Sequence, residues 1–452
     1  MILPLNHLRQ LNGSKYKDYY YIDYGGWKLK ILVIGNGARE HAIVWKLAQS
    51  PKAEEIYIAP GNAGTSMIGI NLDLNPANFE EMAKTCQKTG IDMVIVGPET
   101  PLADGIVDRF QTIGIPIFGP TKGATQIESS KAFAKGLMQK YSIPCAKSSS
   151  FSDFRHAVEF VKQQTPPLWI KADGLAAGKG AIAANSIAAA IDILASIMEE
   201  KVLGDAGNTV VIEESMHGWE MSCFTFSDGK HVSFLANACD YKRINDGDKG
   251  PNTGGMGSFS PPWRNTPEIG DAVMKNIMRP AIKAMDKEKR PYKGILYGGL
   301  MIEEQGPKVI EFNARFGDPE TQVVLPRLKT DLVEIVESVI NGNLDEITVE
   351  CSDEACVGVV MASGGYPGKY TTGYPIYGLD DLDEEIMVFH AGTKTGNNGE
   401  VLTNGGRVLT VVATGKDLNE ARKKAYKNIS RISFEGCYYR RDIALVDNQE
   451  PH

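Results

Sequence analysis

The stretch Lys171-Ala172-Asp173-Gly174-Leu175-Ala176-Ala177-Gly178-Lys179-Gly180 decides how this chain folds around a ligand. It separates two short apolar runs, 167–170 and 181–184, that predict strands. Glycine lets backbone N–H groups approach phosphate oxygens closely, and lysine neutralises those oxygens. The stretch therefore predicts a loop that wraps an anionic ligand, although on its own it is also compatible with a tight glycine-rich hairpin. It is not a Walker loop, because the glycine spacing is one residue too short and Gly180 replaces the metal-binding Ser or Thr.

A second segment, Val309-Ile310-Glu311-Phe312-Asn313-Ala314-Arg315, indicates what the first one holds. On a strand, Glu311 and Asn313 point to the same face because side chains alternate with period two. A carboxylate and an amide oxygen are hard ligands that suit Mg²⁺, which fills the rest of its shell with phosphate oxygens and water. Arg315 follows on the same face, where a guanidinium can hold a substrate phosphate bidentately. Taken alone, the segment is equally compatible with a strand end that carries surface charges.

The N-terminal part of the chain alternates strands and helices, which predicts a doubly wound parallel sheet. In such sheets ligands lie beyond the carboxyl ends of the strands. Three of the predicted ends carry Gly35-Asn36-Gly37, Pro60-Gly61-Asn62 and Gly97-Pro98-Glu99. The predicted strands are 30–35, 55–59, 91–96 and 116–120, and the predicted helices are 41–49 and 78–89.

The first turn resembles a dinucleotide-binding fingerprint only at its start. Glu40 occupies the position of the third glycine, and the second strand ends in Ala59-Pro60-Gly61 without an acidic residue for a ribose hydroxyl. Both departures disfavour NAD. Arg39 and the N-terminus of the following helix are instead suited to a monophosphate.

Bulk composition limits the function classes. The 452 residues carry a formal net charge of −8 and are 42% hydrophobic, which fits two or three globular domains and disfavours nucleic-acid binding as the main role. Seven cysteines without a CxxC motif indicate reduced thiols in a cytoplasmic protein. No apolar run is long enough to span a membrane.

Two further stretches stand out. Residues 1–28 lack the apolar core of a signal peptide and predict a poorly ordered extension, with a natural start at position 29 as one explanation. The stretch Gly250-Pro251-Asn252-Thr253-Gly254-Gly255-Met256-Gly257 predicts a loop, either a flexible substrate lid or a plain surface loop.

From about residue 29 to 445 the chain resembles the glycinamide ribonucleotide synthetases, which are ATP-grasp ligases. The glycine loop and the metal strand are shared in outline with other ATP-grasp enzymes. The segments 250–257 and 315–322 are more specific to this family; further matches are 33–42, 59–65, 95–102, 364–368 and 403–409. Ala38 and Tyr241 depart from the residues that the family often has, glycine and histidine, without removing a proposed ligand.

The resemblance implies an α/β chain with an N-terminal doubly wound parallel-sheet domain, central ATP-grasp domains and a smaller C-terminal α+β domain. Their expected bounds are 29–130, 131–337 with a lid at about 148–216, and 338–445. The implied reaction is the ATP-dependent ligation of glycine to 5-phosphoribosylamine through a glycyl phosphate, in purine biosynthesis. The resemblance also implies Mg²⁺ or Mn²⁺, small-molecule substrates only, and a cytoplasmic monomer.

The resemblance further assigns roles residue by residue. Arg315 and Lys171 are the implied catalytic residues, and Glu311 and Asn313 the implied metal ligands. The implied nucleotide contacts are Lys131, Lys171, Gly174, Gly178, Lys179, Gly180, Glu213, Glu214, Ser215, Met216 and Glu220. The implied contacts of the other two substrates are Asn36, Gly37, Arg39, Asn62, Glu99, Asp240, Lys242, Asn252, Thr253, Arg315 and Asp318.

Three other interpretations compete with this one. Another ATP-grasp ligase of purine metabolism would share the nucleotide site but lack the segments 250–257 and 315–322. An NAD-dependent oxidoreductase is disfavoured by Glu40. A non-catalytic nucleotide-binding module is disfavoured because a sensor has no need of both Glu311 and Asn313.

Overall fold

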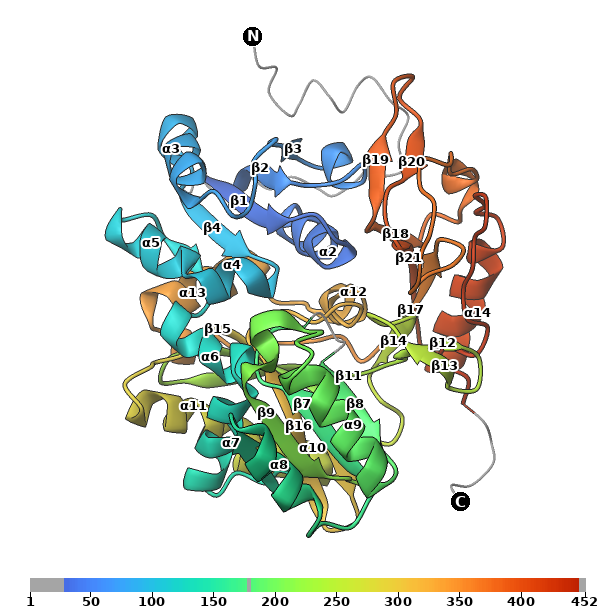
Figure 1. The fold of residues 1–452 in the computed structure, drawn as a ribbon. Helices are drawn as coiled ribbons and strands as arrows, with labels where there is room; N and C mark the ends of the chain where they lie inside the picture. Colours follow the sequence, from blue (N-terminus) through green and yellow to red (C-terminus); the bar gives the residue numbers. More distant parts are fainter. Residues whose placement is uncertain (1–27, 177–179, 447–452) are drawn as a thin grey trace.

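The computed structural model describes residues 28–176 and 180–446. The predicted extension therefore lies, except for Lys28, outside the described residues, as do Gly178 and Lys179 of the glycine loop. Figure 1 shows the N-terminal part (blue), the C-terminal part (orange to red) and the middle of the chain (green) meeting around the short helix α12. Among the described residues, no helix combines the length and the apolar character needed to cross a membrane.

The N-terminal part is the predicted doubly wound parallel sheet. Its five strands lie in the order β3-β2-β1-β4-β5, and every pairing is parallel. Residues Ile31–Ile34 of the central strand are fully buried, as expected for a strand with both faces covered. The elements are β1 (Leu29–Gly35), α2 (Ala38–Leu47), β2 (Ala53–Pro60), β3 (Ile70–Asn71), α3 (Phe79–Thr89), β4 (Met93–Val96), α4 (Glu99–Asp104), α5 (Ile106–Thr112) and β5 (Ile117–Phe118).

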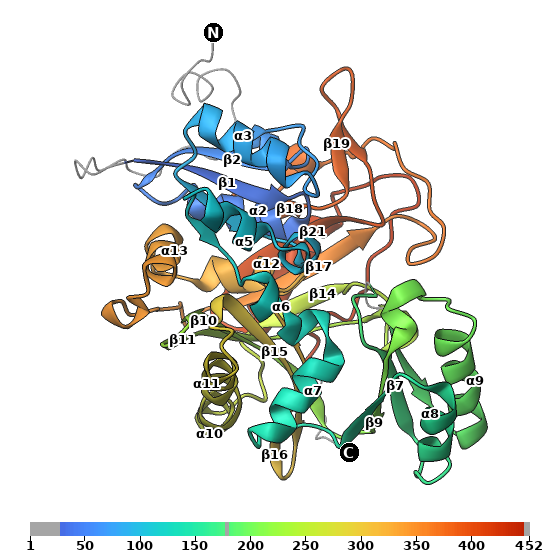
Figure 2. The same ribbon diagram turned by 60° about the vertical axis from the view of Figure 1, so that its left-hand side comes forward.

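Two helices lead from this sheet into a small antiparallel sheet, which Figure 2 shows standing apart at the lower right. Its strand order is β6-β9-β7-β8, and α8 and α9 pack on it through an apolar core of their own. The elements are α6 (Lys122–Ser129), α7 (Lys131–Lys140), β6 (Ser148–Phe151), α8 (Phe154–Val161), β7 (Leu168–Ala172), β8 (Ala181–Ala184), α9 (Ile187–Met198) and β9 (Val210–Glu214).

The rest of the chain is organised by one sheet of eight strands, ordered β16-β15-β10-β11-β14-β17-β21-β18. The middle of the chain contributes β10 (Trp219–Asp228), β11 (Val232–Asp240), β14 (Gly257–Ser260), β15 (Lys293–Glu303) and β16 (Gly306–Asn313). The C-terminal part contributes β17 (Ala355–Ala362), β18 (Met387–His390) and β21 (Arg407–Gly415). The sheet is continuous because β14 pairs with β11 on one side and with β17 on the other.

The remaining elements cover this sheet or extend from it. The helices are α10 (Pro267–Val273), α11 (Arg279–Lys287), α12 (Thr321–Val324), α13 (Leu332–Asn341) and α14 (Leu418–Ile429). The short strands are β12 (Arg243–Asn245), β13 (Lys249–Asn252), β19 (Thr393–Thr395) and β20 (Val401–Thr403).

The predicted loop at 250–257 is partly wrong. Its first residues form β13, which pairs with β12 so that Asn252 lies opposite Arg243. The strand is fully exposed, and Gly250 has a positive φ of 80°. Composition alone predicted a loop because the four glycines and the proline of this stretch hide the register that the facing strand imposes.

A pair of buried histidines joins the N-terminal and C-terminal parts. His41 on α2 accepts a hydrogen bond through Nδ1 from the backbone N–H of His390, at 2.8 Å. Burial, together with the charge of His390, holds the pKa of His41 well below its usual value. Burial also lowers the pKa of His390 to about 4. Both rings are therefore neutral when the protein is folded near pH 7.

These histidines predict acid destabilisation. In the unfolded chain both rings titrate near pH 6.5, so protons favour unfolding as the pH falls from there towards about 4. We expect the His390 ring to lower the free energy of unfolding by about 2 kcal/mol between pH 7.5 and pH 5, and His41 to act in the same direction. Urea unfolding at both pH values measures this, with the exposed His156→Gln as the matched control. An equal pH dependence in His390→Gln and in the unaltered protein would contradict the assignment to that ring.

Candidate functional site

The glycine loop joins β7 to β8, as predicted, and is tied to helix α7. Asp173 accepts hydrogen bonds through Oδ1 from the backbone N–H of Ala132 at 2.6 Å and from the hydroxyl of Ser130 at 3.1 Å. A Cβ added to Gly180 would lie 2.7 Å from the Cβ of Ala176, so this end of the loop needs glycine. The loop therefore begins beside the N-terminus of α7, where Lys131 lies, and its other end is held by the hydrogen bond from the Ala172 N–H to the Gly180 carbonyl at 2.8 Å.

Lys171, the first residue of the glycine stretch, is buried in an ion-pair cluster. Its ammonium lies 3.0 Å from Oε2 of Glu213 on the neighbouring strand β9. The ammonium of Lys135, one turn after Lys131 on α7, lies 3.0 Å from the same oxygen. The exposed fractions are 5% for Lys171, 2% for Glu213 and 4% for Lys135. The other oxygen of Glu213, Oε1, is buried and has no hydrogen-bond partner among the described residues.

Three further predicted nucleotide contacts, Glu214, Ser215 and Met216, follow Glu213 directly. Glu214 ends β9 and exchanges hydrogen bonds with Lys147: its Oε1 accepts from the Lys147 N–H at 2.9 Å, and its own N–H donates to the Lys147 carbonyl at 3.1 Å. Ser215 and Met216 come next, outside any strand and half-buried. Their backbone groups therefore lie beside the ion-pair cluster at the start of the connection to β10.

The two predicted metal ligands lie on β16, two residues apart. The Glu311 carboxylate makes no hydrogen bond or ion pair with any described residue. Burial favours its neutral form, but the positive charges of Lys171, Lys242 and Lys131 outweigh burial and hold the pKa of Glu311 below its usual value. Oδ1 of Asn313 accepts one hydrogen bond, from Arg315 at 3.2 Å.

These donors fit a divalent cation. An ionised carboxylate without a partner and an amide oxygen with a second lone pair are hard ligands of the type that Mg²⁺ or Mn²⁺ takes in small number. The surrounding lysines and arginine are also suited to the phosphates that complete the coordination of such an ion.

Arg315 connects the metal strand to the N-terminal part of the chain. Its Nε donates to Oε2 of Glu99 at 3.0 Å, and its Nη2 lies 3.2 Å from Oε1 of Glu128. Although burial acts in the opposite direction, the two carboxylates raise the pKa of Arg315. Glu128 also accepts the backbone N–H of Ala314 at 2.6 Å. Arg315 is therefore held in a fixed direction from two sides.

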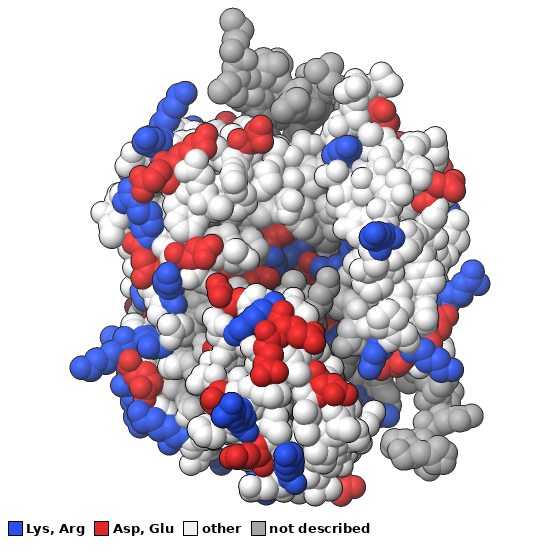
Figure 3. Space-filling model, viewed as in Figure 1, with Lys and Arg blue, Asp and Glu red and all other residues white. Residues whose placement is uncertain are grey.

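Figure 3 shows a hollow at the centre of this face of the molecule, in which acidic and basic side chains lie together. Near the N-terminus of α2, the Nε of Arg39 donates to Oε1 of Glu40 at 2.6 Å, and its Nη1 donates to the Phe316 carbonyl at 3.3 Å. Glu99 lies 3.9 Å from the same guanidinium. The ion pairs of Arg39 and Arg315 therefore share Glu99.

Glu40 accounts physically for the departure from the dinucleotide fingerprint. Its Oε2 accepts the Gly37 N–H at 2.7 Å. A Cβ added to Gly35 or to Gly97 would lie 2.4 Å or 2.1 Å from atoms of the Glu40 side chain. A carboxylate thus fills the space between these glycines, which a dinucleotide pyrophosphate would need.

Asn36 and Asn62 also lie at this end of the sheet. Asn62 is buried, and its amide nitrogen donates to the Asn36 carbonyl at 2.9 Å and to the His390 carbonyl at 2.7 Å. Its Oδ1 accepts the N–H groups of Gly64 and Thr65. The side chain of Asn62 is therefore engaged within the protein, whereas Asn36 is exposed.

A further charged cluster lies at the end of β11 and consists of Asp240, Lys242 and Glu220. Lys242 pairs with Glu220 and lies 3.9 Å from Oδ1 of Asp240. Burial raises the pKa of Asp240 to about 7, and Lys242 opposes this shift. Thr253 donates to the Lys242 carbonyl at 2.8 Å, and Asn252 is exposed at the end of β13.

Asp318 is held by a residue from the C-terminal part. Nη2 of Arg407, at the start of β21, lies 2.6 Å from Oδ2 of Asp318. The same guanidinium donates to the Gly254 carbonyl at 2.7 Å. Arg407 therefore joins the segments 250–257 and 315–322, the two stretches on which the family resemblance rests most.

Sequence reasoning missed Lys135, Glu128 and Arg407. Lys135 had a usable signal, since it lies four residues after Lys131 and shares its helix face. Arg407 lies within the quoted segment 403–409 but received no role. Glu128 had no local signal, because only the tertiary fold brings it to Arg315.

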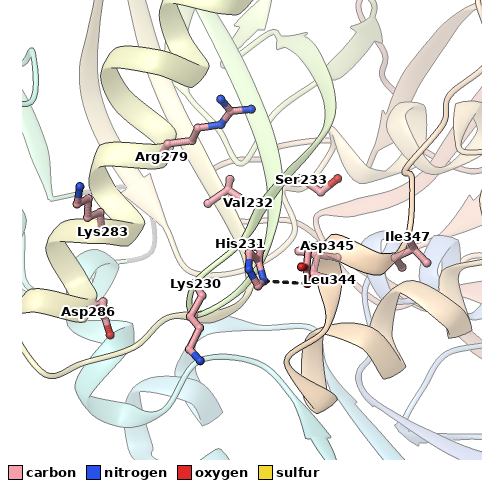
Figure 4. A pocket seen from close by; sticks show the side chains of 11 residues that line it. Lys230, His231, Val232, Ser233, Arg279, Lys283, Asp286, Leu344, Asp345 and Ile347 are labelled. Carbon is pink, nitrogen blue, oxygen red and sulfur yellow. Dashed lines mark ion pairs between the residues drawn. The ribbon is translucent and has the colours of Figure 1, made fainter.

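A cavity of about 640 Å³ lies elsewhere, at the β10–β11 turn. Figure 4 shows His231 paired with Asp345 on one side and Arg279 and Lys283 along a helix on the other. The residues that line this cavity include none of the predicted site residues. The cluster around Arg315 and Glu311 is therefore the better candidate for the functional site.

Comparison with known proteins identifies the family. Three family models match: the Phosphoribosylglycinamide synthetase N domain at residues 29–128, its ATP-grasp (A) domain at 129–321 and its C domain at 356–446. The phosphoribosylamine–glycine ligase of Caldanaerobacter subterraneus is 46% identical over 416 residues, which cover 92% of this chain and 99% of that protein. The corresponding ligase of Escherichia coli K12 is 47% identical over 420 residues, or 92% of this chain and 98% of that protein.

Comparison with solved structures gives the same family. The phosphoribosylamine–glycine ligase of Thermotoga maritima has a TM-score of 0.81 at 34% identity, covering 92% of this chain and all of that one. A biotin carboxylase domain from Hydrogenobacter thermophilus has a TM-score of 0.71 at 16% identity, which shows a shared fold only. With all three domain models matched and relatives of nearly half identical sequence over most of its length, the chain belongs to the phosphoribosylglycinamide synthetase family.

Proposed function

We propose that this chain uses ATP to join glycine to 5-phosphoribosylamine, giving glycinamide ribonucleotide, ADP and phosphate. The observation that carries the proposal is the placement of Arg315. Its guanidinium contacts Glu99 and Glu128 on one side. On the other side it contacts Asn313, which lies on the strand of the candidate metal ligands. A phosphorylated substrate held by Arg315 is thereby next to a nucleotide held through Glu311.

The chemistry needs no covalent enzyme intermediate. The glycine carboxylate attacks the γ-phosphorus of ATP, and ADP leaves, which gives glycyl phosphate. The amine nitrogen of phosphoribosylamine then attacks the acyl carbon; phosphate leaves and the nitrogen loses one proton. Positioning and neutralisation of phosphate charge supply the catalysis in reactions of this type.

The buried cluster of Lys171, Lys135 and Glu213 supports the nucleotide side of the proposed site. Lys171 and Lys131 contact the phosphates, and the loop from Gly174 through Gly178 and Lys179 to Gly180 covers them. Glu213 meets the adenine, because its buried Oε1 lacks a donor and the adenine amino group supplies one. The backbone of Glu214, Ser215 and Met216 lines the adenine edge, and Glu220 contacts the ribose.

The metal and substrate sides complete the assignment. Glu311 and Asn313 would hold Mg²⁺ or Mn²⁺, which neutralises phosphate charge when bound. Arg315 binds phosphoribosylamine, and the other contacts of the two small substrates are Asn36, Gly37, Arg39, Glu99, Asp240, Lys242, Asn252, Thr253 and Asp318. Since the side chain of Asn62 is engaged internally, its part is to hold the Asn36 turn.

The substrates are small molecules, and the net charge of −8 supports the absence of nucleic acid. We infer a cytoplasmic monomer, which size-exclusion chromatography at several protein concentrations tests; an elution volume that shifts with concentration would contradict it.

Omission of single components tests the reaction. We expect ADP release only when ATP, Mg²⁺, glycine and freshly generated phosphoribosylamine are all present, with glycinamide ribonucleotide as the product. ADP release at the full rate without glycine would keep the nucleotide site but remove the substrate assignment. Absence of any ADP from folded, ATP-binding protein would instead favour a non-catalytic module.

A further inference from the structure

Two buried lysines pair with one carboxylate oxygen, so the cluster holds two positive charges and one negative charge. Lys171 and Lys135 each lie 3.0 Å from Oε2 of Glu213, and all three side chains are almost fully buried. Breaking a buried ion pair is costly when it leaves one charge without a partner. If Lys171 alone neutralised Glu213, turning it towards a phosphate would leave a bare carboxylate in the protein interior.

Lys135 removes that cost. Its ammonium has no hydrogen-bond partner of good geometry among the described residues, so its polar contact is the ion pair with Glu213. It extends from α7, whose first turn is tied to the glycine loop through Asp173. Burial lowers the pKa of Lys135, and the Glu213 charge opposes this shift. Lys135 therefore lies at the proposed nucleotide site, one helical turn after Lys131.

We propose that Lys135 is a positioning residue: it remains the counter-ion of Glu213 and so frees the Lys171 ammonium to bind the nucleotide phosphates. The inference rests on the proposed nucleotide site. Before binding, the cluster carries one more positive than negative charge, which favours an incoming phosphate. After Lys171 turns to the phosphate, Lys135 and Glu213 remain as a neutral pair.

A four-member set of variants tests this: the unaltered protein, Lys135→Met, Glu213→Gln and the double variant. Glutamine keeps an acceptor oxygen for the adenine while removing the buried charge. Calorimetry with Mg·ADP and with adenosine gives the dissociation constants. We expect Lys135→Met to weaken ADP binding by about tenfold to a hundredfold but adenosine binding by less than about twofold, because Lys171 contacts only phosphates.

The Glu213→Gln background supplies the decisive comparison. There, Lys135→Met is expected to change ADP binding by less than about threefold, since no buried carboxylate remains to be neutralised. In turnover assays, the KM for ATP rises in Lys135→Met while the KM for glycine stays constant. Lys140→Met is the matched control, because Lys140 ends the same helix with a side chain that is 63% exposed.

Three outcomes would overturn the inference. An unchanged ADP affinity in Lys135→Met removes the role altogether. An equal loss in the Glu213→Gln background means that Lys135 acts on the phosphates directly by its own charge. An equal loss of adenosine affinity means that Lys135 only supports the structure of the site. Failure of the unaltered protein to bind ADP is a separate result, which overturns the proposed nucleotide site and this inference with it.

Discussion

Replacing Glu311 with alanine should lower kcat by about a thousandfold or more while the protein stays folded. The carboxylate is the one ionised candidate ligand of the divalent cation, and loss of the charge neutralisation that the cation supplies costs several kcal/mol in the transition state. The fold should survive, because the carboxylate makes no hydrogen bond or ion pair with any described residue. Steady-state ADP release and a thermal melt measure the two quantities.

The control for this prediction is Glu304→Ala, which removes an exposed carboxylate at the turn between β15 and β16. It should keep full activity. A second measurement is titration with Mn²⁺, whose binding should weaken in Glu311→Ala but not in Glu304→Ala. Undiminished turnover in Glu311→Ala would remove this residue from the site and with it the proposed metal position.

The second large effect is expected for Arg315→Ala. Loss of a charge-assisted, bidentate contact should raise the KM for phosphoribosylamine by about a hundredfold, with a much smaller change for ATP. The fold should also lose stability, because the buried Glu128 would lose its counter-ion, while the half-buried Glu99 would keep only the longer contact with Arg39. Initial rates over a range of each substrate, together with urea unfolding, separate the two effects.

Two comparisons sharpen this test. Arg315→Lys keeps the charge but not the planar fork, so we expect most of the stability to return while the KM remains high. Arg155→Ala, which removes an exposed arginine on α8, should change neither quantity. If Arg315→Ala lost only stability and kept the KM for phosphoribosylamine, Arg315 would be structural rather than a substrate contact.

Local sequence predicted much of the N-terminal fold because its signals are local. Largely apolar strands alternating with helices are typical of a parallel sheet covered on both faces, and the structure has this sheet. Glu311 and Asn313 were placed together by the period of a strand alone. The hairpin at 243–252 was missed, because its register comes from the pairing partner rather than from its own glycines.

The partners of the site residues could not be predicted in the same way. The family resemblance assigned Glu213 to the nucleotide, but the two lysines that pair with it come from α7 and β7. Arg315 meets Glu128 across 187 positions of sequence, and Arg407 reaches Asp318 from the C-terminal part. Glu40 was recognised as a departure from a fingerprint, but only the close packing against three glycines explains it.

The sequence by itself determined which chemical groups are available: a glycine loop with lysines, a carboxylate and an amide two residues apart on a strand, and an arginine after them. These follow from residue type and from the short periods of strand and helix. Only the tertiary structure decided which charges neutralise one another, because ion pairing in a low-dielectric interior depends on burial and on contacts between distant segments. The Lys135–Glu213–Lys171 cluster and the Arg315–Glu128 pair are two such contacts, because the tertiary fold brings their distant segments together.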